Sequence, residues 1–177
     1  MAHFLINHIL CEFSLAGFTA GSHYTNTGAA AELICLPEDP TWDHFTPGVQ
    51  DAASHLYGAE YKFDARNRVE YFGREIHDHD VPCVVCRLPR STILMVPGRT
   101  ACYDSWSLEY RGYLAAGHHS HASASHFVCI DNEAEVVSGG SGSDNGYLFY
   151  FVEPRCGSLK CPPYVEGQEL SCVVCSK

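Results

Sequence analysis

The sequence contains little positive charge. Lysine and arginine together number 11, against 21 aspartates and glutamates, and the formal net charge is −10 at pH 7. Because a protein that binds a phosphate backbone neutralises it with basic side chains, this balance argues against a nucleic-acid partner. The chain also has no apolar run of about 18 residues, the length that a membrane-spanning helix needs, so no membrane span is expected.

Motifs of catalysis and glycosylation are missing as well. The sequence has no His-Glu-X-X-His, Gly-X-Ser-X-Gly, P-loop or Gly-X-Gly-X-X-Gly motif, each of which marks a catalytic or nucleotide-binding arrangement. It has no Asn-X-Ser/Thr sequon either, so N-glycosylation is not expected. Acidic residues are plentiful, but their spacing does not place two carboxylates in one cleft. We expect that the protein is not an enzyme.

Cysteine, in contrast, is abundant. Ten cysteines occur in 177 residues, and an even number in a chain of globular composition indicates disulfides formed in an oxidising compartment. We therefore expect a secreted, extracellular protein that forms a single compact unit over residues 1–177. The first 20 residues are apolar but lack a positively charged start, and Asn7, His8 and Glu12 interrupt them. Any signal peptide is thus expected to precede residue 1.

Nearly the same cysteine phrase occurs twice. "VPCVVCR" at 81–87 and "LSCVVCS" at 170–176 lie 89 residues apart. Further landmarks recur in the same order, at offsets between 88 and 94 residues: Cys11 with Cys102, a glycine in an apolar stretch after each of these, Cys35 with Cys129, and the aromatic stretch 57–63 with 145–151 at offset 88. The pattern predicts an internal duplication, with pseudo-equivalent subdomains at about 1–90 and about 91–177.

Short runs rich in β-branched and aromatic residues predict an all-β or mostly β fold. The stretch "LEYRGYL" at 108–114 alternates, which places Leu108 and Tyr110 on one face of a strand and Glu109 on the other. The stretch "YLFYFV" at 147–152 is apolar on both faces, so it is either buried twice or pressed against another subunit. Asn145-Gly146 predicts a tight hairpin, and 49–58 has helical character for one or two turns.

The two Cys-X-X-Cys phrases admit three interpretations. A redox site needs an exposed, low-pKa thiol where a strand meets a helix, and neither phrase opens a helix. A zinc site usually has its two pairs roughly 15–20 residues apart, whereas these pairs lie in equivalent places of two distant repeats. The structural interpretation fits best. In it, each phrase is joined by disulfides to the two earlier cysteines of its own half.

The cysteine order, together with "CYDSWSLEYRGYLAAG" at 102–117 and "GYLFYFVEPRCGSLKCPPYVEGQELSCVVC" at 146–175, resembles a known family. It is similar to the C-terminal non-collagenous domain of sponge short-chain collagens and to free-standing invertebrate proteins of that type, and more distantly to the C-terminal domain of type IV collagen. The resemblance implies a mostly β fold of two similar subdomains, and self-association in extracellular matrix with its own copies or related chains. It also implies five disulfides: Cys11–Cys86, Cys35–Cys83, Cys102–Cys175, Cys129–Cys172 and Cys156–Cys161. No Gly-X-Y repeat occurs, so the sequence encodes no collagen triple helix.

Histidines gather in two places. The stretch 117–126 contains His118, His119 and His121, and a His-X-His spacing on a strand puts both rings on one face, which suits a divalent transition metal. The alternative is a solvated, hydrogen-bonding loop. The stretch 76–80 is a weaker candidate for a metal site, in which Asp78 and Asp80 could act as ligands beside the two histidines. The stretch 143–145 has calcium-type ligands, but a turn is the favoured interpretation.

Two functions therefore compete. The first is a secreted structural module that self-associates into matrix, fibre or filament assemblies. The alternative is a secreted recognition module, either lectin-like or metal-binding. A repeated, disulfide-rich chain without a catalytic motif favours the first.

Overall fold

The computed structural model describes residues 12–28, 30–63 and 68–177, and this part of the chain is almost entirely β-structure. The prediction of a mostly β fold is confirmed. The described residues contain nine strands and one short helix, in the order β1 (Glu12–Gly21), β2 (Ile34–Pro37), β3 (Tyr57–Tyr61), α1 (Arg68–Phe72), β4 (Pro82–Arg87), β5 (Ile93–Pro97), β6 (Ser107–Ala116), β7 (Val128–Asp131), β8 (Tyr147–Phe151) and β9 (Ser171–Ser176).

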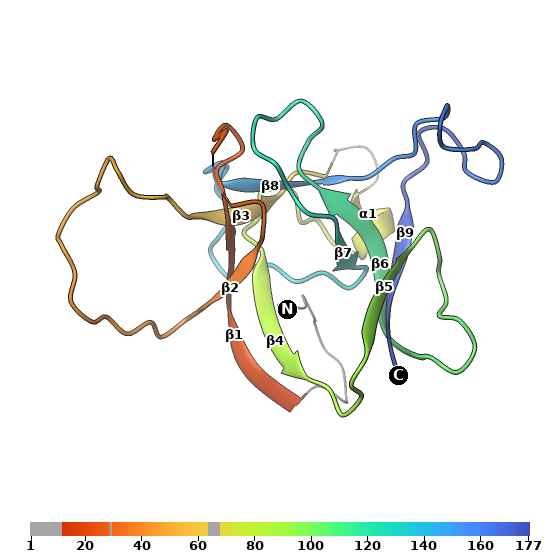
Figure 1. Ribbon diagram of the computed structural model, residues 1–177, viewed down its shortest axis with the longest axis horizontal. Coiled ribbons are helices and arrows are strands. Elements are labelled where there is room, and N and C mark those ends of the chain that lie inside the picture. The colour runs from red at the N-terminus through yellow and green to blue at the C-terminus, as the bar shows by residue number, and fades with distance from the viewer. Residues whose placement is uncertain (1–11, 29, 64–67) are drawn as a thin grey trace.

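The strands form one curled sheet with two similar lobes (Figure 1). The order along the sheet is β2-β1-β3-β8-β6-β9-β5, while β4 pairs with β1 and β7 pairs with β6. We call residues 12–87 the first half and residues 93–176 the second half. The halves meet where β3 and β8 pair in parallel, with Ala59 opposite Tyr147 and Tyr61 opposite Phe149.

Strand pairing follows the same register in both halves. In the first, β1 pairs with β4 so that Gly17 lies opposite Cys83, and a bulge separates Phe13 from Leu15. In the second, β6 pairs with β9 so that Gly112 lies opposite Cys172, and a bulge separates Leu108 from Tyr110. β2 and β7 pair with β1 and β6 in matching registers too. Three pairs of ranges are thus equivalent: 12–21 and 107–116, 34–37 and 128–131, and 76–87 and 165–176.

Hydrogen bonds also fix the equivalence of β3 and β8. In the first half, Val81 N donates to Ala59 O and Asp78 N donates to Tyr61 O. In the second half, the matching bonds run from Leu170 N to Val152 O and from Gly167 N to Pro154 O. Residues 57–61 are therefore equivalent to 150–154. The predicted match of 57–63 with 145–151 at offset 88 is wrong. Those aromatic stretches look alike because they lie side by side in the parallel β3–β8 pair, in which both are buried.

The main core lies around this junction between the halves. It contains Tyr61, Phe63 and Phe149, each with at most 1% of its surface exposed, and neighbouring buried side chains from both halves. Strand β8 lies between β3 and β6, and its first three residues are buried. Of the two alternatives for this stretch, burial within the chain is the one observed. Another subunit is not needed to cover it.

Three local predictions are wrong. The stretch 49–58 is not helical, and the helix of the described residues is instead α1. Asn145 has a φ of 58°, as a turn requires, but the strand that follows it pairs with β3 and β6, so Asn145-Gly146 closes no hairpin. The predicted alternation of β6 is observed from Tyr110 to Leu114 but is wrong before the bulge, where Glu109 is buried and Leu108 is 49% exposed. An extra residue in one strand turns every later side chain to the opposite face.

Candidate interaction surface

The disulfides explain the curl of the sheet. β2 and β4 lie on opposite edges of β1, and in a flat sheet two such strands would be about 9.5 Å apart. The Cα atoms of Cys35 and Cys83 are nevertheless 5.7 Å apart, and those of Cys129 and Cys172 in the second half are 5.8 Å apart. Each half is therefore folded about its middle strand, and a disulfide closes the fold.

A glycine makes each of these folds possible. A Cβ on Gly112 would lie 2.7 Å from the carbonyl carbon of Ile130, and one on Gly17 would lie 2.7 Å from that of Leu36. Real Cβ atoms essentially never approach other atoms that closely. The glycine in the "AGF" and "RGY" stretches is thus the point at which the flanking strand crosses the middle strand.

Four of the five disulfides implied by the resemblance are formed with the expected partners: Cys35–Cys83, Cys102–Cys175, Cys129–Cys172 and Cys156–Cys161. The fifth pair, Cys11–Cys86, lies outside the described residues because of Cys11, although Cys86 is itself disulfide-bonded. No described cysteine is free. The Cys-X-X-Cys phrases therefore carry structural disulfides and not redox-active thiols.

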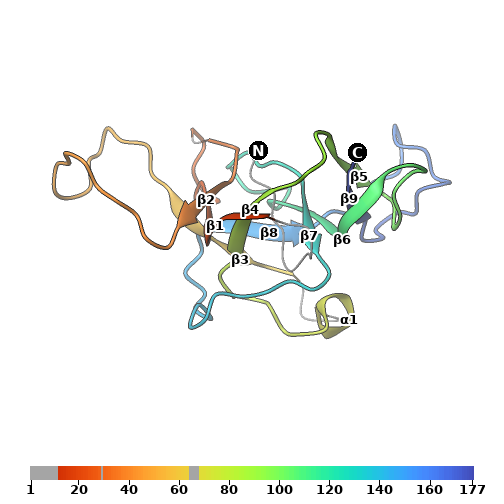
Figure 2. The ribbon, with the colours of Figure 1, turned by 90° about the horizontal axis from the view of Figure 1, so that it is seen from below.

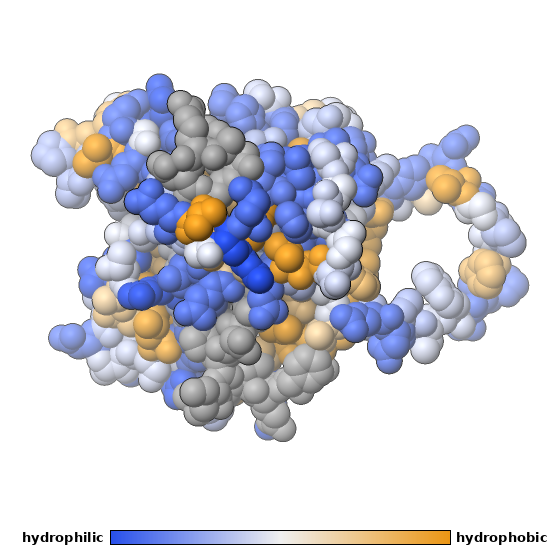
Figure 3. All heavy atoms as spheres, turned by 180° about the vertical axis from the view of Figure 1, so that it is seen from behind, coloured by the Kyte–Doolittle hydropathy of each residue, from blue (hydrophilic) through white to orange (hydrophobic). Residues whose placement is uncertain are grey.

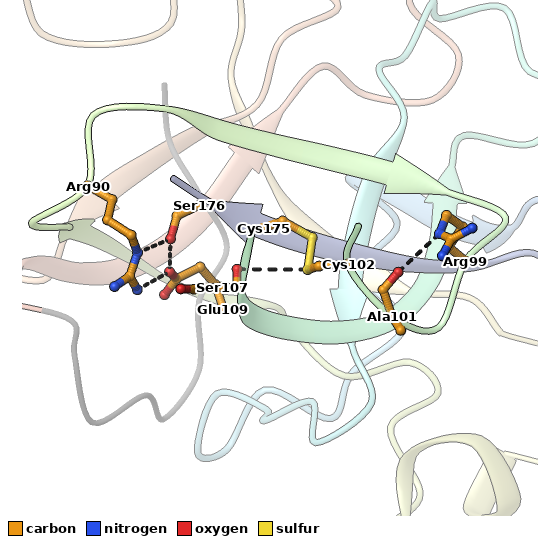
Figure 4. The surroundings of a disulfide bond; sticks show 8 residues. All are labelled: Arg90, Arg99, Ala101, Cys102, Ser107, Glu109, Cys175 and Ser176. Carbon is orange, nitrogen blue, oxygen red and sulfur yellow. Dashed lines mark hydrogen bonds and ion pairs between the residues drawn. A yellow bond between two sulfur atoms is a disulfide. The ribbon is translucent and has the colours of Figure 1, made fainter. Parts of the chain in front are cut away.

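A buried ion pair lies beside the Cys102–Cys175 disulfide (Figure 4). Glu109, with 3% of its side chain exposed, accepts a hydrogen bond of 2.6 Å from Arg90 Nη2. The hydroxyl of Ser176 donates to the same carboxylate. Because Arg90 belongs to the connection between the halves, this pair fastens that connection to β6 and β9. Sequence alternation had placed Glu109 on the exposed face.

One face of the first half is covered by a loop of the second half. We call residues 132–146 the covering loop. Tyr61 Oη donates to Glu135 O at 3.2 Å, Asp80 N donates to Gly140 O at 2.8 Å, and Val137 N donates back to Asp80 O at 3.1 Å. Ala134 in this loop is fully buried.

Charged groups hold the far end of the covering loop. Lys62 forms ion pairs with Glu60, at 3.1 Å, and with Asp78, and its ammonium donates to Ser143 Oγ at 2.8 Å. The backbone N–H of Asn145 donates to Glu60 Oε1 at 2.6 Å. Hydrogen bonds to Asp78 and Glu60 raise the pKa of Lys62 against the lowering effect of its burial, so it stays charged. We call this surface, which comprises residues 59–61 and 76–81, the covered face.

The equivalent surface of the second half is only partly covered: Pro154 is buried and Tyr71 of α1 hydrogen-bonds to Glu169, but its outer part is exposed. We call it the open face; it comprises residues 152–154 and 165–170. Val165 is 57% exposed, whereas its equivalent, Ile76, is fully buried. The side chain of Arg155 is 81% exposed, whereas that of its equivalent, Lys62, is 10% exposed. A cavity of about 480 Å³ opens on this face, lined among others by Pro154, Tyr164, Val165, Glu169 and Leu170.

A long loop of the first half stands away from the body. Residues 38–56, here called the free loop, connect β2 to β3 as the covering loop connects β7 to β8. Every residue of it is exposed, and the loop projects from the molecule in Figures 1 and 3. Four of its side chains are large and apolar: Trp42, Phe45, Val49 and Leu56, with 79%, 66%, 82% and 50% of their surfaces exposed. Sequence reasoning missed this loop, although "TWDHF" at 41–45 puts two aromatic residues in a polar stretch.

The histidine cluster lies in a turn after β6. The rings of His118 and His119 are 4.2 Å apart, and those of His118 and His121 are 5.2 Å apart. His118 Nδ1 contacts Ser120 Oγ at 2.8 Å. Burial, with the neighbouring imidazoles, lowers the pKa of His121, which favours the neutral form that a metal binds.

No group of three or more metal-type side chains in the described ranges is arranged to hold an ion. The three imidazoles are thus neighbours without converging on one point. Metal binding at His118, His119 and His121 stays a prediction.

The other polar candidates have structural contacts. Asp78, from the stretch 76–80, pairs with Lys62, and His77 Nε2 lies 3.4 Å from its carboxylate. Asp80 faces the covering loop, where burial, with Glu60 and Asp144, raises the pKa of its carboxyl. The stretch 143–145 has irregular backbone, with Asn145 Nδ2 donating to Ser143 O at 3.1 Å.

No protein-family model, curated protein or solved structure matches the chain. In the part of the chain that the structure describes, no helix has the length and apolar character of a membrane span.

Proposed function

We propose that the protein is a secreted extracellular structural module that associates with other copies of itself. The free loop of one copy would cover the open face of the next. The observation that carries the proposal is the contrast between the halves. The face of the first half is covered by a loop, whereas the equivalent face of the second half is largely exposed. The free loop of the first half, with four exposed apolar side chains, is available to cover such a face in another copy.

The relation within one chain gives the geometry of the contact. There, a loop of the second half covers a face of the first half. Repeating that relation between chains places the free loop of the first half of one copy on the open face of the second half of another. Donor and acceptor are different surfaces, so the contact is heterologous and leads either to a closed ring or to a filament.

Apolar burial favours this contact. Fully burying a large apolar side chain contributes about 2 kcal/mol, so the four side chains of the free loop, which are only partly exposed, together contribute roughly 6 kcal/mol. Association costs an estimated 4–15 kcal/mol of lost motion, in addition to the ordering of the loop. The free loop alone therefore comes close to balancing that cost, and a stable assembly needs a further contact at the same junction.

Secretion is the compartment that suits the disulfides, which persist in oxidising environments. The four described disulfides, and the absence of a membrane-spanning helix among the described residues, fit this assignment. The proposed role agrees with the C-terminal collagen domains that the sequence resembles, in which such modules assemble in matrix.

Size-exclusion chromatography with light scattering, over a wide dilution range, tests the proposal. The wild-type protein is expected to show concentration-dependent oligomers, and a Trp42→Ser/Phe45→Ser variant is expected to be monomeric at the same concentrations. Because both side chains are exposed, the variant should keep the thermal unfolding midpoint of the wild-type monomer. Val69→Ser, which removes a 59%-exposed apolar residue of α1, is the matched control and should associate normally. A well-folded wild-type protein that is monomeric at high concentration would refute self-association and favour the recognition module.

A further inference from the structure

A second bare face lies on the first half. Phe18 in β1 and Ile34 in β2 are each 43% exposed. Their equivalents in the second half, Tyr113 and Val128, are partly buried against the core. At this surface the second half is covered and the first half is exposed, which is the reverse of the contrast between the covered face and the open face.

The cover on the second half comes from α1. The ring centroids of Tyr71 and Phe72 lie 4.9 Å and 5.7 Å from that of Tyr113. In Figure 2, α1 lies off one side of the sheet, near β6 and β7. Helix α1, which follows β3 in the chain, therefore lies on the second half. There it shields Tyr113, the residue equivalent to Phe18.

The segment that follows β8 stays exposed instead, with its last residue, Tyr164, beside Gly98 at the edge of the cavity. We call residues 155–164 the stapled loop, because the Cys156–Cys161 disulfide closes it over five residues of separation. All of its residues are exposed, and Leu159 and Tyr164 present apolar surface, each 37% exposed. It occupies the same position in the chain order of the second half as the α1 segment does in the first.

Opposite charges surround the two surfaces. The stapled loop carries two exposed basic side chains, Lys160 and Arg155, of which Arg155 is paired with Glu166 at 3.1 Å. The bare face has exposed acidic side chains before and after β2, namely Glu32, Glu38 and Asp39. Complementary charges of this kind fix the orientation of two partners and accelerate their encounter.

We propose that the copy whose open face is covered packs its stapled loop on Phe18 and Ile34 of the copy that supplies the free loop, with Lys160 facing the acidic residues at the ends of β2. The inference rests on the proposed function, because it places a second contact at the junction that the free loop forms. It repeats between chains the contact that α1 makes within one chain. It gives the local disulfide a role, which is to hold an exposed loop in the shape that the neighbouring copy recognises.

Charge reversal on each surface tests this contact, with dissociation constants measured by sedimentation at low salt. Lys160→Glu and Glu32→Lys, the latter at a position before β2 and outside the free loop, are each expected to weaken self-association about tenfold, because like charges then meet across the junction. An equimolar mixture of the two variants should associate close to wild-type strength, since the reversed charges again attract. In about 1 M salt the difference between wild type and variants should shrink, because screening acts over about 3 Å there. Arg74→Glu makes the same charge change elsewhere on the first half and should leave association unchanged.

The outcomes separate this inference from the proposed function. If the wild-type protein associates, the free-loop variant does not, and Lys160→Glu matches wild type, the stapled-loop contact is wrong while self-association stands. Loss of association in Lys160→Glu without recovery in the mixture would also overturn the contact, since it would indicate a local disturbance of the loop. A wild-type protein that stays monomeric overturns both proposals.

Discussion

Replacing Gly112 by alanine tests the mechanism by which each half of the sheet curls. Gly112 lies in the middle of β6, opposite Asp131 of β7 and Cys172 of β9. An added Cβ would lie 2.7 Å from the carbonyl carbon of Ile130 and 2.9 Å from the backbone nitrogen of Asn132. Both neighbours are backbone atoms, so no side-chain rotation can relieve the overlap, and β7 must move.

The cost of that movement can be estimated from two terms. Forcing extra atoms into a packed region costs about 1–3 kcal/mol. Displacing β7 also opposes closure of the Cys129–Cys172 disulfide, which spans 43 residues and contributes about 4 kcal/mol in the loop-entropy model. Loss of part of that contribution brings the expected loss in free energy of unfolding for Gly112→Ala to roughly 3 kcal/mol or more.

Urea unfolding of the oxidised protein, followed by circular dichroism, measures this loss. Gly17→Ala should cost a similar amount, because Gly17 meets Leu36 and Pro37 in the equivalent geometry of the first half. Gly58→Ala is the matched control: it is also a strand glycine, nothing lies within 4 Å of its Cβ position, and the substitution should be neutral or slightly stabilising. A Gly112→Ala protein within about 0.5 kcal/mol of wild type, below even the smallest overpacking cost, would refute the explanation of the curl.

Two further predictions concern the disulfides and the histidines. Replacing Cys129 and Cys172 together by serine should lower the free energy of unfolding by about 4 kcal/mol, whereas the same change at Cys156 and Cys161, which close a much shorter loop, should cost about 2 kcal/mol; equal losses in denaturant unfolding would contradict the loop-length argument. Calorimetry should detect Zn²⁺ binding that weakens as the pH falls below about 6.5, since protonated imidazoles cannot ligate a metal. A His119→Ala/His121→Ala variant should lose that heat while His126→Ala keeps it, and equal heats from all three proteins would leave the cluster as an ordinary polar turn.

Composition and local pattern predicted much of the fold. β-branched and aromatic runs marked the strands, because such residues fit a pleated, half-buried surface wherever they occur. The repeat of the Cys-X-X-Cys phrase located β4 and β9, and the resemblance supplied the four disulfide partners that the structure describes. The bulge before Tyr110 was not predictable in this way. A single extra residue leaves no mark in composition, yet it decides whether Glu109 or Leu108 is buried.

The candidate interaction surface depended on information that the sequence does not carry locally. Val165 and Ile76 are similar apolar residues at equivalent positions, but Ile76 is buried in a core cluster that includes Ala134 of the covering loop, whereas Val165 is 57% exposed. The sequence suggested that 147–152 could contact another subunit, but β8 pairs with β3 on one edge and with β6 on the other within the chain. The three most exposed large apolar side chains of the described residues, Trp42, Phe45 and Val49, are in the free loop, where polar neighbours concealed them from pattern reasoning.

Photo-crosslinking from the free loop tests the central proposal most directly. A photoreactive benzoylphenylalanine would replace Phe45, and protein labelled with ¹⁵N would be mixed with unlabelled protein before irradiation. Mass spectrometry should then find crosslinks that join the free loop of one isotopic form to residues 152–170 of the other. Crosslinks confined to single chains, or directed to the covered face of the first half, would contradict the proposed assembly.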